Sequence, residues 1–145
     1  MIYVAASSAE IERAERWSDR LRSEGIPVTS VWPETIRRVQ RERQMASTHE
    51  ASNPRAATVA DKREWSSENI RQILAAETFW LLVPTPPLLS EGAYYEFAVA
   101  GRERKLTIAS GGGDNQRMVF TAMAHILCED DEHAFEIIRK IHARR

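Results

Sequence analysis

The chain has 145 residues, 43% of them hydrophobic, which is typical of one compact domain with a hydrophobic core. Its 20 basic and 21 acidic residues nearly cancel, so the composition gives no indication of binding to nucleic acid. No apolar run approaches the roughly 20 residues that a membrane-spanning helix needs, and the single cysteine excludes an internal disulfide. We therefore expect a cytoplasmic protein of one domain, residues 1–145, that acts neither on nucleic acid nor in a membrane.

Short apolar runs alternate with helical patterns along the chain, which predicts parallel strands joined by helices. The first apolar run predicts a strand rather than a signal peptide, because no basic leader precedes it. Ser7 and Glu10 have the spacing of a capping box at the start of the first helix, and Gly25 is expected to end this helix. The predicted strands are residues 1–6, 27–31, 79–84, 106–109 and 126–128, and the predicted helices are residues 9–24, 93–102 and 132–143, with a further helix beginning near Asp61.

The pattern of residues 34–60, in the middle of the chain, is harder to assign to a helix or a strand. Residues 37–43 are rich in arginine with weak helical periodicity. We expect a solvated helix face there, although such a run also attracts phosphate. Residues 43–58 collect Ser, Thr, Asn and Pro without apolar periodicity, which predicts a mobile segment able to fold over a ligand as a lid.

Residues 79–84 (FWLLVP) form an almost continuous apolar run, which is typical of a central parallel strand covered on both faces. Trp32 and Pro33 are expected to end the second strand. The whole pattern predicts an α/β fold of the flavodoxin-like or Rossmann-like type, an open parallel sheet of about five strands with helices on both faces. In such folds ligands bind at the carboxyl ends of the strands.

Glu96 is the candidate catalytic residue. It follows Gly92 by one helical turn and lies on the same helix face, so the glycine leaves open space above the carboxylate. Its early position in the helix is expected to keep it ionised, through free backbone N–H groups and the helix dipole. An ionised, accessible carboxylate suits nucleophilic attack on the anomeric carbon of a sugar. The alternative is a surface glutamate without a catalytic role, which composition alone favours.

Several other residues have both a structural and a functional interpretation. Ser7 and Ser8 follow the first strand, where they either cap a helix or bind phosphate or sugar hydroxyls. Tyr3 belongs either to the core or to a ligand site. The glycines at 111–113 form a flexible loop rather than a dinucleotide fingerprint, and Asn115 beside them is a candidate for reaching the site. The four histidines show no metal-ligand spacing, so we expect no metal site.

The order and spacing of these motifs resemble the nucleoside 2-deoxyribosyltransferase family over nearly the whole chain. Gly92, Glu96 and Ala100 match the family's Gly-x-x-x-Glu-x-x-x-Ala helix, in which the glutamate is the nucleophile. Three further segments are similar to family patterns: IYVAASS at residues 2–8, VTSVW at residues 28–32 and SGGGDNQRMVF at residues 110–120. The resemblance implies N-glycosidic chemistry without a cofactor, on a small-molecule nucleoside or nucleotide, in a homo-oligomer whose sites are completed by a neighbouring subunit.

Two positions differ from the family pattern. If Glu77 is the acidic residue that closes the third helix, the family's usual aspartate corresponds to Asn69, whose amide can hydrogen-bond a leaving base but cannot protonate it. The neighbouring Glu68 is expected to point about 100° away. Ser90 stands where transferases of free nucleosides often carry an acid, and it resembles the serine with which the related nucleoside monophosphate hydrolases hold phosphate.

The leading hypothesis is an enzyme that cleaves or transfers the N-glycosidic bond of a 2′-deoxyribonucleoside or its 5′-monophosphate. Two alternatives stay open: a non-catalytic nucleotide-binding or sensing module on the same fold, and a glycosidase acting on a nicotinamide nucleotide. The resemblance assigns catalysis to Glu96 and Asn69, and substrate binding to Tyr3, Ser7, Ser8, Ser90, Gly92 and Asn115.

Overall fold

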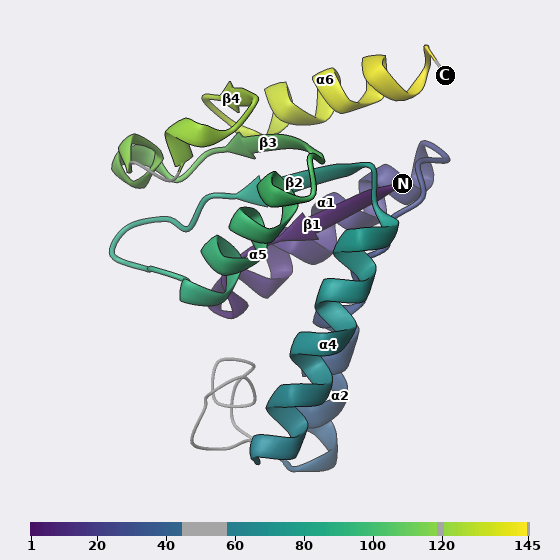
Figure 1. The fold of residues 1–145 in the computed structure, drawn as a ribbon, viewed down its shortest axis with the longest axis vertical. Helices are drawn as coiled ribbons and strands as arrows, with labels where there is room; N and C mark the ends of the chain where they lie inside the picture. The colour runs from purple at the N-terminus through teal and green to yellow at the C-terminus, as the bar shows by residue number, and fades with distance from the viewer. Residues whose placement is uncertain (45–57, 119–120, 145) are drawn as a thin grey trace.

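The computed structural model describes residues 1–44, 58–118 and 121–144 (Figure 1). Most of the segment predicted to be mobile, residues 43–58, lies outside the described residues. Within the described ranges, no helix combines the length and the apolar character that crossing a membrane requires.

A fully parallel sheet of four strands forms the centre of the fold, and the strands lie in chain order across it (Figure 1). Every residue of the first two strands is buried, as expected for strands covered on both faces. The predicted α/β fold with an open parallel sheet is therefore confirmed. The strands are β1 (Ile2–Ala5), β2 (Thr78–Leu82), β3 (Leu106–Ser110) and β4 (Ile126–Cys128).

The predicted number of about five strands is one too high, because residues 27–31 form only a single bridge, between Ile2 and Val28. The backbone N–H of Val4 would continue this ladder, but it donates to the side-chain hydroxyl of Ser30 at 3.2 Å. A helix then begins at Trp32. A side chain thus replaces the carbonyl partner that a fifth strand would supply.

Five α-helices and three short 3₁₀ helices lie in the described parts of the chain. The α-helices are α1 (Ile11–Ser23), α2 (Trp32–Glu42), α4 (Val59–Ala75), α5 (Glu91–Arg102) and α6 (Asp131–His142). The 3₁₀ helices are η1 (Ser8–Glu10), η2 (Gly113–Arg117) and η3 (Thr121–Met123).

Two neighbouring residues of β2, Phe79 and Trp80, point to opposite faces of the sheet and show which helices cover each face. Trp80 contacts Trp17 of α1, and the Trp17 ring also packs on Phe135 of α6, at centroid distances of 5.4 and 5.7 Å. Phe79 contacts Phe97 of α5 at 6.1 Å. Helices therefore cover both faces, as predicted, with α1 and α6 on one and α5 on the other.

The start of α1 differs from the predicted capping box. The Ser7 hydroxyl accepts a hydrogen bond from the backbone N–H of Ala9 at 3.3 Å and so caps η1, and α1 begins only at Ile11. A capping box would turn the Glu10 carboxylate back toward Ser7. Instead this carboxylate accepts a hydrogen bond from the Thr85 hydroxyl at 2.7 Å, because the loop after β2 passes close by.

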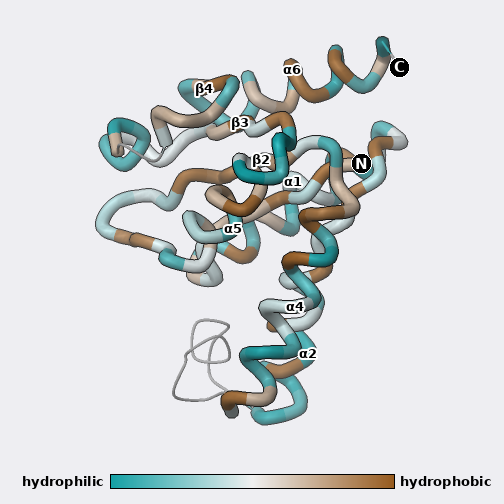
Figure 2. The backbone as a smooth tube through the Cα atoms, in the orientation of Figure 1, coloured by the Kyte–Doolittle hydropathy of each residue, from teal (hydrophilic) through white to brown (hydrophobic). Residues whose placement is uncertain are grey.

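Helices α2 and α4 lie side by side and extend together beyond the sheet (Figure 1). Hydrophilic and hydrophobic residues alternate along both of them (Figure 2). Where α2 ends and α4 begins, Arg43 pairs with Asp61 at 2.9 Å. Arg37 of α2 donates two hydrogen bonds to the carboxylate of Glu15 on α1. The arginine-rich run is therefore part of a helix, and Arg37 already has a carboxylate as its partner.

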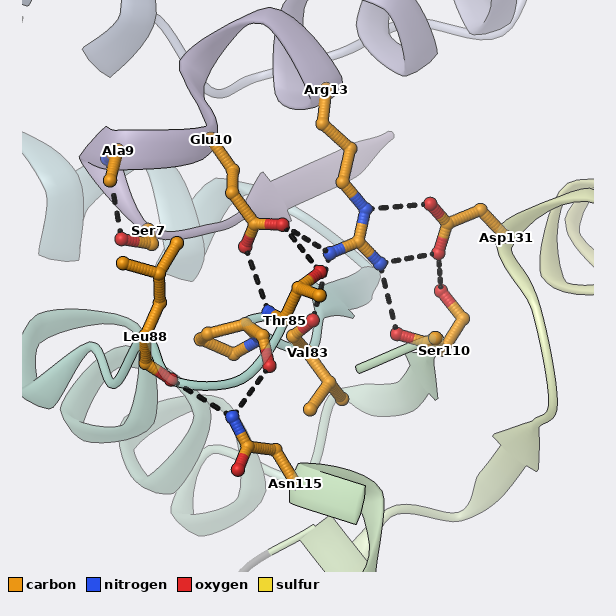
Figure 3. Close-up of polar contacts among 12 residues, drawn as sticks. Ser7, Ala9, Glu10, Arg13, Val83, Thr85, Leu88, Ser110, Asn115 and Asp131 are labelled. Atoms are coloured by element: carbon orange, nitrogen blue, oxygen red, sulfur yellow. Dashed lines mark hydrogen bonds and ion pairs between the residues drawn. The ribbon is translucent and has the colours of Figure 1, made fainter. Parts of the chain in front are cut away.

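A largely buried ion pair joins α1 to α6 at the carboxyl ends of β2 and β3 (Figure 3). The Arg13 guanidinium donates two hydrogen bonds to the carboxylate of Asp131, at 2.7 and 2.8 Å, and others to the backbone carbonyls of Val83 and Ser110. Burial by itself raises the pKa of Asp131, but hydrogen bonds from Arg13 and Ser110 outweigh it and hold the pKa below its usual value. The residue after Ser110 is Gly111, which has a φ of +66°. A Cβ at this position would collide with the Arg13 guanidinium.

The Arg13→Met variant should lose about 3–5 kcal/mol of folding stability, because it leaves Asp131 buried without its cationic partner. Urea denaturation measures the loss as a shift in midpoint. The matched control is Arg38→Met on α2, since Arg38 is exposed and approaches its partner Glu42 only to 4.0 Å. The control should change stability by less than about 0.5 kcal/mol. Equal effects of the two substitutions would contradict the structural role of the buried pair.

Candidate functional site

A cleft of about 680 Å³ opens beside the carboxyl end of β1, within the range of about 300–1,000 Å³ common for small-molecule sites. Helices α2 and α4 contribute one part of its wall, and the first half of α5 contributes another. The cleft therefore lies at the sheet edge where the sequence predicts a ligand. The described residues that line it include Ala6, Ser8, Trp32, Trp65, Asn69, Ser90, Gly92 and Glu96.

The two predicted catalytic residues meet at this cleft. The side-chain amide of Asn69, on α4, donates a hydrogen bond to Oε1 of Glu96, on α5, at a distance of 2.8 Å. Both side chains are half-buried. Gly92, one turn earlier on α5, also lines the cleft, and a Cβ placed on it would meet no other atom within 4 Å. The space predicted at the glycine is therefore open.

Tyr3 lies in the core next to Glu96 and is not among the described residues that line the cleft. Its ring stacks on Phe79, with centroids 5.4 Å apart. Its hydroxyl is buried without a hydrogen bond of regular geometry, yet it interacts with Glu96. Burial, and then the negative charge of Glu96, raise the pKa of Tyr3. The structure thus gives Tyr3 a contact with the catalytic candidate in place of the predicted contact with substrate.

The expectation that a helix N-terminus keeps Glu96 ionised is wrong. Glu96 is the sixth residue of α5, whereas the unpaired backbone N–H groups of a helix belong to its first turn. Burial of the carboxylate raises its pKa to about 7, and the interactions with Asn69 and Tyr3 offset this only in part. Near neutral pH, Glu96 therefore exists in both its protonated and its ionised form.

The three predicted binding serines have different positions. Ser90 lines the cleft and caps α5, since its hydroxyl oxygen accepts a hydrogen bond from the backbone N–H of Ala93 at 3.3 Å. Ser8 also lines the cleft. Ser7 is buried and uses its hydroxyl oxygen to cap η1 (Figure 3), so it lies outside the described lining. Of these three serines, Ser8 and Ser90 belong to the described lining of the cleft.

Asn115 supports the loop between β2 and α5 rather than the cleft itself. Its side-chain amide donates hydrogen bonds to the backbone carbonyls of Pro84 and Leu88, at 2.8 and 2.9 Å (Figure 3). It is absent from the described lining of the cleft. Asn115 therefore holds the loop that leads to Ser90, and its contact with substrate stays a prediction.

Most of the wall that α2 and α4 provide was not predicted from the sequence. Trp65 and Asn69 are four residues apart on α4 and line the cleft together, a spacing that places them on one helix face. That spacing could have identified the two residues from the sequence as neighbours on one face of the helix. Glu68 was expected to point away, but it too lines the cleft, and its carboxylate accepts hydrogen bonds from Arg71 and Gln72. Lys62, one turn after the start of α4, completes the charged groups on this wall.

The described residues contain no group of three or more His, Cys, Asp or Glu side chains arranged to hold a metal ion. Comparison of the sequence with protein-family models and with curated proteins finds no match.

The Glu96→Gln variant should be more stable than the wild-type protein at pH 8, by about 2–3 kcal/mol. Folding raises the pKa of Glu96 from an ordinary 4.5 to about 7, so the folded state holds this proton more tightly than the unfolded state. Stability therefore falls as pH rises between these two values, and the amide removes this loss. Melting temperatures of both proteins at pH 4 and pH 8 measure the effect, which should vanish at pH 4.

The control for this measurement is Glu91→Gln, an exposed position at the start of the same helix. It should follow the pH dependence of the wild-type protein. If Glu96→Gln is no more stable than the wild-type protein at pH 8, the carboxylate is not buried as described.

Proposed function

We propose that the protein cleaves or transfers the N-glycosidic bond of a 2′-deoxyribonucleoside or its 5′-monophosphate, with Glu96 as the nucleophile. The observation that carries this proposal is the hydrogen-bonded pair of Asn69 and Glu96 in the wall of a cleft large enough for a nucleoside. These two positions are also the ones to which the resemblance to nucleoside 2-deoxyribosyltransferases assigns catalysis.

In the proposed reaction the ionised carboxylate of Glu96 attacks C1′ of the sugar, and the base departs with the electron pair of the C–N bond. Water or a second base then attacks C1′ of the glycosyl ester and releases Glu96. The hydrogen bond from Asn69 to Oε1 fixes the orientation of the carboxylate. Trp65 and Tyr95, which both line the cleft, offer aromatic faces on which a base can stack.

A non-catalytic nucleotide-binding or sensing module is the second candidate function. The amide of Asn69 favours it, because an amide cannot protonate a departing base. The two candidates differ in one observable, the release of free base from a bound nucleoside or nucleotide.

The Glu96→Gln variant should release base at least about 10³-fold more slowly than the wild-type protein, because an amide is a far poorer nucleophile than a carboxylate. Chromatography of a panel of deoxynucleosides and deoxynucleotides, incubated with each protein, measures the released base. Glu103→Gln, an exposed position just after the end of α5 and outside the described lining of the cleft, serves as the control and should keep its activity. Retention of a large share of turnover by Glu96→Gln would refute the nucleophile assignment.

The same assay at several pH values provides a second check. Only the ionised carboxylate attacks, so kcat/KM should rise with pH through an apparent pKa of about 7 and level off above it. Binding without release of base, in both the wild-type protein and the variant, would identify the sensing module.

The Ser90→Asp variant should show whether the protein prefers a 5′-monophosphate or a free nucleoside as its substrate. Ser90 lies at the start of α5, where backbone N–H groups and its hydroxyl proton can bind an anion, and Lys62 lines the same cleft. We expect the wild-type protein to prefer the monophosphate. The aspartate should lower kcat/KM for the monophosphate about 10- to 100-fold by charge repulsion, with little effect on the nucleoside.

Aspartate is also a good N-cap residue, so this substitution should leave the stability of α5 nearly unchanged. The quantity to compare is kcat/KM for a deoxynucleoside and for its 5′-monophosphate, in both proteins. If the wild-type protein prefers the free nucleoside, the phosphate interpretation is wrong.

A further inference from the structure

In the described part of the chain, two side chains contact the Glu96 carboxylate, the amide of Asn69 and the phenol of Tyr3. Neither is a carboxylic acid that could protonate a departing base, and Tyr3 is buried in the core. Glu68, the residue next to Asn69 on α4, has both carboxylate oxygens engaged as acceptors, one from Arg71 and one from Gln72. Both oxygens of Glu68 are therefore already engaged by side chains of its own helix.

This lack of an acid matters for the choice of substrate. A neutral purine or pyrimidine leaves a sugar readily only when one of its nitrogen atoms is protonated during bond cleavage. A positioned general acid contributes about 10²–10⁴-fold to such a step. Asn69 cannot make this contribution, so a base that needs no proton gains a corresponding advantage in this cleft.

The described lining of the cleft also favours a positively charged ring. Its carboxyl groups outnumber its single lysine, even though Arg71 pairs with one of them. Three aromatic side chains, from α2, α4 and α5, line the same space, and an aromatic face attracts a cation within about 6 Å. The charged and aromatic residues are Glu68, Glu91, Glu96, Lys62, Trp32, Trp65 and Tyr95.

We propose that the preferred substrate is an N-glycoside whose base carries a positive charge before cleavage, such as an N-ribosylpyridinium or an N7-alkylated purine nucleoside. This inference rests on the proposed N-glycosidic function of Glu96. The Glu96 carboxylate bonds to C1′ as the C–N bond breaks, and the electron pair of that bond cancels the charge on the ring nitrogen. The base departs neutral without receiving a proton. Water then attacks C1′, the ester bond returns its electrons to Glu96, and one proton passes to solvent.

Two matched substrate pairs test this inference in the full-length protein. One pair is 7-methyl-2′-deoxyguanosine and 2′-deoxyguanosine, and the other is nicotinamide riboside and its uncharged 1,4-dihydro form. Chromatography measures the released base, after subtraction of spontaneous hydrolysis. We expect kcat/KM for the charged member of each pair to exceed that of the neutral member by at least about 100-fold.

The outcomes separate this inference from the function on which it rests. Equal or higher kcat/KM for the neutral members overturns the inference and leaves the proposed function standing. Release of base from none of the four compounds overturns the inference, and it overturns the proposed function as well if the wider panel of deoxynucleosides and deoxynucleotides also releases no base.

The Asn69→Asp variant tests the missing acid directly. A carboxyl group at this position should raise kcat/KM for 2′-deoxyguanosine at least about tenfold, because it can protonate the neutral base. The value for 7-methyl-2′-deoxyguanosine should not rise, since that base needs no proton. A folded variant with an unchanged ratio of the two values overturns the inference, and the wild-type ratios decide the question if the variant does not fold.

The Glu68→Gln variant tests the charge of the cleft. KM for the charged substrates should rise several-fold, while KM for the neutral substrates stays the same. The matched control is Glu64→Gln, an exposed position on the same helix that lies outside the described lining. Equal changes in KM for charged and neutral substrates overturn the role of charge in recognition.

Discussion

The ion pair of Arg13 and Asp131 joins α1 to α6 across the carboxyl ends of β2 and β3, where it also holds the loop that leads to α5. Both charged groups are largely buried, and each is stabilised by further hydrogen bonds, including those that Asp131 accepts from Trp17 and Ser110. A buried charge is tolerated only when its partners are complete in this way. On the face covered by α1 and α6, these side chains occupy the carboxyl ends of β2 and β3. The ligand cleft lies elsewhere, at the end of β1 beside α4 and α5.

The same network positions α5, the helix that carries Glu96. The loop after β2 is held by Arg13, which bonds the carbonyl of Val83, by Glu10, which accepts from Thr85, and by the amide of Asn115 (Figure 3). This loop leads directly into α5, so its position determines where the first turns of that helix lie. Side-chain hydrogen bonds from α1, η1 and η2 to this loop therefore link the face covered by α1 and α6 to the position of α5.

The cleft itself contains a conflict between stability and chemistry. Burial raises the pKa of Glu96 to about 7, so at neutral pH the folded protein loses stability whenever this side chain ionises. Only the ionised side chain can act as a nucleophile. Asn69 and Tyr3 reduce the effect of burial without abolishing it. Proteins commonly retain such locally unfavourable groups at functional sites, because the rest of the core compensates for them.

The sequence by itself determined the parallel α/β organisation and the place of Glu96 one turn after Gly92, because apolar periodicity and helical spacing are local properties. Residues 27–31 have a strand-like pattern, yet the hydroxyl of Ser30 takes the donor that a fifth strand needs. Such a contact between distant segments leaves no mark in a local pattern. The protonation of Glu96 likewise depends on contacts between segments that are distant in the sequence. Only the tertiary structure decided it, because burial and the partners Asn69 and Tyr3 come from elements that are far apart in the chain and meet only in the folded protein.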